Sequence, residues 1–115
     1  MTSEDELLKE ARKDIEDGKK EEGAKKLLKS ANEMAKGQKF QEAAKVFEEA
    51  ALVFKELNNA EECFKSFEQA TVMLVRLPQT QEVYSEIVRL NNKAAKIAED
   101  ATYFVDSSCI DARYL

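Results

Sequence analysis

Apolar side chains recur along the chain at the three- and four-residue spacing that is typical of amphipathic helices. Five windows carry this pattern, and they are separated by residues that favour turns: Gly18, Gly37, Asn58-Asn59 and Pro78. The pattern predicts five helices near residues 4–17, 20–36, 39–57, 60–77 and 80–105. Because the connections are only a few residues long, we expect consecutive helices to run antiparallel.

Several residues near these boundaries favour helix ends. Ser3, followed by Glu6 three residues later, fits a capping box, and Thr80 after Pro78 is a second candidate N-cap. Gly18 and Gly37 can adopt the left-handed conformation that closes a helix at its carboxyl end.

The third and fourth windows are related by a shift of twenty residues, which indicates an internal repeat of one helix and one turn. The shift pairs Phe47 with Phe67 and Ala50 with Ala70. Small residues let neighbouring helices approach closely while aromatic rings fill the space between helix pairs. We therefore predict that these four residues lie in the core.

Two such units approach the length of a tetratricopeptide repeat, which is about 34 residues. The sequence thus predicts an all-α fold in which antiparallel helical hairpins stack into a short α-solenoid of the tetratricopeptide (TPR) kind. A five-helix up-down bundle is the alternative, because it uses the same short loops and the same periodicity. With one domain's length of chain, we assign residues 1–105 to a single helical-repeat domain and residues 106–115 to a C-terminal tail.

The fifth window differs from the others because its apolar positions form a heptad-like seam from Val83 to Phe104. A long terminal helix can use such a seam to cover the end of the stack. The alternative is a partner helix or a homodimer through residues 83–104.

Composition excludes most enzyme classes. The chain has no histidine, which removes His-based catalytic triads and the commonest metal-ligand sets, and it has no Gly-rich phosphate loop or nucleophile motif. We expect a non-enzymatic protein without catalytic residues, cofactor or bound metal. The paired glutamates Glu48-Glu49 and Glu61-Glu62 are interpreted as surface charges that pair with lysines of their own helices.

Charge and hydropathy bear on location and partners. The net charge of −5 disfavours nucleic-acid binding. The sequence lacks an apolar run of the ~20 residues needed to span a bilayer, and its amino terminus is acidic. We expect a cytoplasmic protein with at most peripheral membrane association. Cys63 and Cys109 are expected to be reduced thiols, with Cys63 buried on an apolar helix face.

Residues 24–70 carry small and aromatic residues at fixed spacings. The series consists of MAKGQKF at the end of the second helix, Phe40-x-x-Ala43-Ala44, Phe47-x-x-Ala50-Ala51 and Ala60-x-x-Cys63-Phe64. It resembles the amino-terminal helical hairpins of the soluble NSF attachment proteins, the SNAP family. The resemblance implies a TPR-like solenoid that acts as an adaptor in vesicle trafficking, lying along a SNARE-like helical bundle and presenting it to an AAA-type ATPase.

The candidate partner-binding residues are Lys25, Lys29 and Lys36, which form one stripe of the second helix, with Lys26 and Lys39 beside it. Basic residues of SNAP proteins contact the acidic SNARE bundle, so the resemblance implies a similar role for this stripe, whereas a solvated lysine face is the simpler interpretation. Two other functions remain open: a TPR-type scaffold that binds a short peptide in its groove, and a helical subunit of a larger complex.

Overall fold

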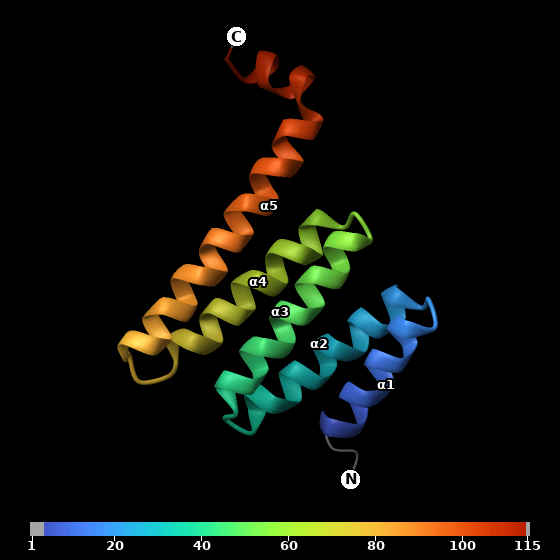
Figure 1. The fold of residues 1–115 in the computed structure, drawn as a ribbon, viewed down its shortest axis with the longest axis vertical. Coiled ribbons are helices and arrows are strands. Elements are labelled where there is room, and N and C mark those ends of the chain that lie inside the picture. The colour runs from blue at the N-terminus through green and yellow to red at the C-terminus, as the bar shows by residue number, and fades with distance from the viewer. Residues whose placement is uncertain (1–3, 115) are drawn as a thin grey trace.

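A computed structural model describes the backbone of residues 4–114 and the side chains of residues 4–100. Within this range the chain forms five α-helices, which confirms the predicted all-α class (Figure 1). They are α1 (Glu4–Glu16), α2 (Lys20–Lys36), α3 (Phe40–Glu56), α4 (Ala60–Val75) and α5 (Gln81–Tyr114).

The first four helices lie within two residues of their predicted bounds, but α5 is longer than predicted. It continues past residue 105 to Tyr114, so most of the predicted tail at 106–115 is helical. The segment after residue 105 contains no glycine or proline, and nothing in it therefore stops the helix.

The first three turns are one structure repeated every twenty residues. Gly18, Gln38 and Asn58 are left-handed, with φ of 90°, 63° and 60°. In each turn the N–H of the left-handed residue donates to the carbonyl three positions earlier, and the next N–H donates to the carbonyl five positions earlier. This is the Schellman arrangement, and it reverses the chain in three residues.

The expectation for Gly37 was wrong. Its φ is −84°, and the next residue, Gln38, adopts the left-handed conformation instead. The hydrogen-bond pattern of the repeated turn fixes the left-handed residue at position 38, midway between Gly18 and Asn58. Thr80 is confirmed as an N-cap, because its hydroxyl accepts from the Val83 N–H at 3.2 Å. Ser3 lies outside the described residues.

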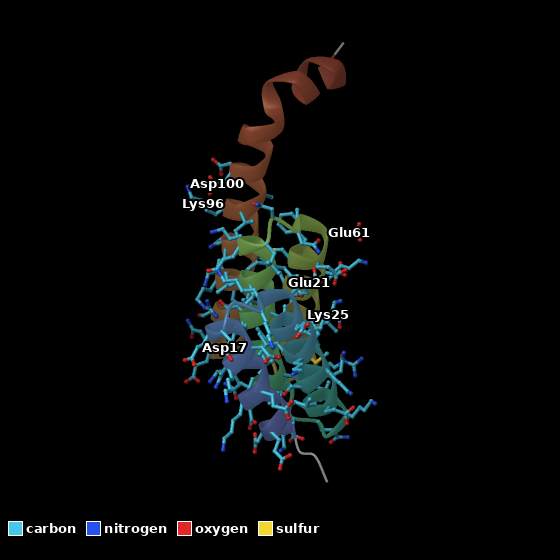
Figure 2. The ribbon with its side chains drawn as sticks, turned by 90° about the vertical axis from the view of Figure 1, so that its right-hand side faces the viewer. Asp17, Glu21, Lys25, Glu61, Lys96 and Asp100 are labelled. Atoms are coloured by element: carbon cyan, nitrogen blue, oxygen red, sulfur yellow. The ribbon has the colours of Figure 1, made fainter. Side chains whose placement is uncertain are left out.

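The helices form a row in two layers. The closest packing is between helices that are consecutive in the chain, and α1 and α5 lie at opposite ends of the row (Figure 1). Viewed from the α1 end, Lys25 and Glu61 emerge on one side and Lys96 and Asp100 on the other (Figure 2). The molecule measures 55 × 38 × 17 Å, the dimensions of an open hairpin stack.

The core lies along α3, which is packed between α2 and α4. Phe47, Ala50, Phe67 and Ala70 are all at most 3% exposed, which confirms their predicted burial. At three positions twenty residues apart, the repeat places small, buried residues where each helix meets the one before it: Gly23, Ala43 and Cys63.

The seam of α5 packs against this core. Leu90 is 2% exposed, and Val83, Ile87, Ala94 and Ile97 are partly buried against the core. As far as Ile97, the seam therefore covers the end of the stack, which was the first of the two interpretations. The alternative, a partner helix or a homodimer through residues 83–104, stays a prediction. The side chain of Phe104 lies outside the described part.

Candidate partner-binding cleft

The three candidate lysines lie on one exposed stripe of α2. Lys25 contacts Glu21 at 3.7 Å and Lys36 contacts Glu33 at 3.1 Å, both within the helix. Among the described residues, Lys29 forms no ion pair. The stripe thus carries a small local excess of positive charge that faces solvent.

The two flanking lysines hold α1 in place instead. Lys26 lies 2.7 Å from Asp14, and Lys39 lies 2.6 Å from Glu4. The hydrogen bond from Lys39 lowers the pKa of Glu4, and the bond to Asp14 raises the pKa of Lys26. Helical spacing placed these two lysines beside the stripe, but it could not reveal their ion-pair partners, because those belong to another helix.

A cleft between α2 and α4 lies beside the stripe. It consists of two hollows of about 520 and 450 Å³ that share Asn32, and Phe47 and Phe40 of α3 contribute to its lining. We call this the α2–α4 cleft. The remaining lining residues are Leu28, Ala35 and Lys36 of α2, Glu62, Lys65, Ser66, Glu68, Gln69 and Met73 of α4, and Arg76 directly after α4.

The lining combines apolar and polar groups. The partly exposed side chains of Leu28 and Phe40 offer apolar contact, with the buried Phe47 and Met73 beneath them. The Arg76 guanidinium lies 5.6 Å from the centre of the Phe40 ring. Ser66 is 2% exposed, and its hydroxyl has no hydrogen-bond partner among the described residues. The arrangement suits an amphipathic segment with its apolar side toward the phenylalanines.

Sequence reasoning found the lysine stripe but missed the cleft. Phe40 and Phe47 are seven residues apart, two helical turns, so both lie on the same face of α3. That spacing was the available signal. It did not reveal that α2 and α4 leave an opening over this face.

The interpretation of Glu48 and Glu49 was wrong, because both bind residues of other helices. Glu48, with a side chain 14% exposed, accepts two hydrogen bonds of 2.9 Å from Arg89 and one of 3.0 Å from Lys93 of α5. The bonds from Arg89 are the main cause of the lowered pKa of Glu48. Glu49 forms an ion pair of 2.9 Å with Arg12 of α1.

Glu61 and Glu62 do behave as expected, because both lie within 4 Å of Lys65 on their own helix. Cys63 is fully buried, and this burial raises the pKa of its thiol, so it packs as a small core residue. The side chain of Cys109 lies outside the described part. Within the described residues, no group of three or more Cys, Asp or Glu side chains could hold a metal ion.

No protein-family model matches the sequence, and no curated protein or solved structure shows significant similarity to it. Among the described helices, none combines the length and the apolar composition needed to cross a membrane.

Proposed function

We propose that the protein is a non-enzymatic adaptor that binds an acidic, amphipathic helix or helical bundle at the α2–α4 cleft. The observation that carries the proposal is the position of a phenylalanine-lined cleft beside three exposed lysines. Recognition of a helix in a groove commonly uses an apolar helix face as the anchor and surrounding charges for orientation.

The charges support a partner with acidic residues on one side. Lys29 is exposed and unpaired among the described residues, and Lys25 and Lys36 have only weak partners within α2. A partner carboxylate can therefore approach all three without breaking an ion pair between helices. The SNARE-like bundle, the AAA-type ATPase and the role in vesicle trafficking belong to this proposal through the SNAP resemblance alone.

A second candidate is a TPR-type scaffold for an extended peptide. It is favoured by the polar lining of the cleft, where the exposed amides of Asn32 and Gln69 can hydrogen-bond a peptide backbone. The two candidates differ in the conformation of the ligand, so the test must include both kinds.

The test measures binding of two acidic probes, a soluble four-helix coiled coil and an unstructured peptide, to the parent and to a variant with Lys25→Glu, Lys29→Glu and Lys36→Glu. We expect the coiled coil to bind more tightly than the peptide. The variant should associate at least tenfold more slowly at low salt and much less so at ~0.5 M salt, where the Debye length is roughly 4 Å.

The matched control carries the same charge change at Lys9, Lys13 and Lys96, which are exposed on α1 and α5, and it should bind like the parent. Asn32→Trp tests the cleft itself, because Asn32 is exposed and a large ring there fills the opening without disturbing the core. Full binding by both the lysine variant and Asn32→Trp would refute the proposal. Tighter binding of the peptide would select the TPR-type scaffold.

A further inference from the structure

The outer side of α5 carries an exposed stripe that nothing in the described chain covers. Tyr84 is 64% exposed and Val88 39% exposed, and both belong to the large apolar side chains that are exposed in the described part of the chain. Asn91 and Ala95 continue the stripe at helical spacing, and Ala98 follows half-buried. We call residues 84, 88, 91, 95 and 98 the α5 outer stripe.

The α5 outer stripe lies one residue further along the helix than the seam that packs on the core. The seam uses residues such as Ile87 and Leu90, whereas Val88 and Asn91 point away from it. The helix therefore has a second, uncharged surface beside the seam, and among the described side chains only those of the seam pack on the core.

Charged residues are absent from the outer stripe although they make up 36% of the chain. From Gln81 to Ala95, the charged side chains are Glu82, Glu86, Arg89 and Lys93, and helical spacing places all four on the opposite face. Lys96 and Glu99 follow on the flank of the stripe at its carboxyl end. Arg89 and Lys93 point toward Glu48 of α3. Depletion of charge around an exposed tyrosine is typical of the centre of a protein interface.

The two ends of the stack differ in the charge of the side chains that they expose. The exposed side chains of α1 are charged throughout the described helix, as expected for a cap that faces water. At the α5 end, the charged side chains lie on other faces of the helix and leave the outer stripe uncharged. The helix α4 also exposes two apolar side chains, Val72 and Val75, which are 36% and 58% exposed. A head-to-tail contact between α5 of one copy and α1 of the next would thus bury the charges of α1 against an uncharged face.

We infer that the α5 outer stripe is the interface of a homodimer in which α5 packs antiparallel against α5 of a second copy. The stripe is complementary to itself about Asn91. In this arrangement Tyr84 meets Ala98 of the second copy and Val88 meets Ala95 of the second copy, so large residues face small ones. The two Asn91 amides lie at the two-fold axis and can hydrogen-bond each other.

A second copy suits this surface because the stripe brings no like charges together, although each chain has a net charge of −5. The contact is about four helical turns long, which is at the small end for stable interfaces, so we expect a dissociation constant of about 10–100 μM. The inference is independent of the proposed function, since the α2–α4 cleft stays open in the dimer.

Sedimentation equilibrium from about 1 μM to 1 mM tests the inference directly. We expect a reversible monomer–dimer equilibrium that Val88→Glu weakens at least tenfold, because each dimer would bury two new carboxylates. Lys13→Gln is the control, because it makes the net charge more negative by the same amount at an exposed position of α1, at the opposite end of the stack. A monomer throughout this range, or a dimer that Val88→Glu leaves unchanged, would overturn the inference.

Disulfide trapping tests the position of the axis. In a Cys109→Ser background, Asn91→Cys should form an intermolecular disulfide rapidly on mild oxidation, since the native Cys63 is buried. Lys96→Cys is exposed on the same helix but outside the stripe, and it should cross-link much more slowly. Equal rates for the two variants would contradict an antiparallel pairing centred on Asn91.

Discussion

At Gly23, the helices α1 and α2 approach each other closely. A Cβ atom at this position would lie 2.5 Å from Cγ1 of Ile15 and 2.7 Å from the carbonyl oxygen of Ala11. The backbones of α1 and α2 can pack at this distance only because Gly23 has no side chain. The equivalent positions one and two repeats later hold Ala43 and Cys63, so those helix pairs leave room for a side chain.

We expect Gly23→Ala to destabilise the protein by about 1–3 kcal/mol, because the new methyl group forces α1 away from α2. Urea unfolding followed by circular dichroism measures the change. Gly37→Ala is the control: its nearest neighbour would be 3.6 Å away and its φ of −84° suits alanine, so stability should hold or rise slightly. Equal stability of Gly23→Ala and the parent would show that the helices separate at no cost.

Core residues were predictable because each of them occurs at an equivalent position in both copies of the repeat. Phe47 and Phe67 share a position in the twenty-residue pattern, and burial at one implies burial at the other. The left-handed Gln38 was not predictable from residue type, because glycine next to it has the stronger preference for that conformation. The geometry of the turn decided the outcome at position 38.

At the scale of helices, Glu48 links α3 to α5. Its carboxylate accepts bonds from Arg89 and Lys93, which are 41 and 45 residues away in the chain. Sequence patterns that compare positions three or four apart could not find such pairs. Arg12 with Glu49 joins α1 to α3 in the same way, so these charges position alternate helices of the stack.

We expect Glu48→Gln to cost about 1–3 kcal/mol at pH 7, because Arg89 and Lys93 lose the charged acceptor that the largely buried Glu48 side chain provides. The pKa of Glu48 in the folded protein lies below its ordinary value of 4.5, so its contribution is present above pH 4.5 and is lost as the pH falls through the folded-state pKa. Urea unfolding at a series of pH values should therefore show parent and variant converging in acid.

The control for this prediction is Glu61→Gln, whose side chain is 78% exposed and contacts only Lys65 on its own helix. It should change stability by less than about 0.5 kcal/mol at either pH. A difference between Glu48→Gln and the parent that stays constant down to pH 3 would mean that the lost bonds, and not the charge, set its stability.

At the scale of the whole molecule, the fold class followed from periodicity, while the candidate site did not. Short turns and five amphipathic windows leave few arrangements, and the stacked order of the hairpins is one of them. The α2–α4 cleft depends on the separation of two helices that are not adjacent in the chain, with α3 between them. The length of α5 was also missed, because the sequence carries no stop signal and the prediction ended where the apolar seam ended.

An open stack should also lose its structure unevenly. Each helix packs mainly on its neighbours in the chain, and the buried residues are concentrated in α3, whereas Ala11 is the one buried residue of α1 within the described part. Stability in such arrays is close to a sum of local terms, so the ends open before the centre. We expect native-state hydrogen exchange to be slowest for α3 amides and fastest for α1 amides.

Gly23→Ala tests this order of opening, because the added methyl group weakens the contact between α1 and α2. Exchange should accelerate in α1 and then in α2, while the amides of α4 keep the rates of the parent. Mass-spectrometric exchange with peptide resolution separates these segments. Uniform exchange rates from α1 to α4, with uniform acceleration in the variant, would instead show a single cooperative unit. That is the behaviour of a closed five-helix bundle.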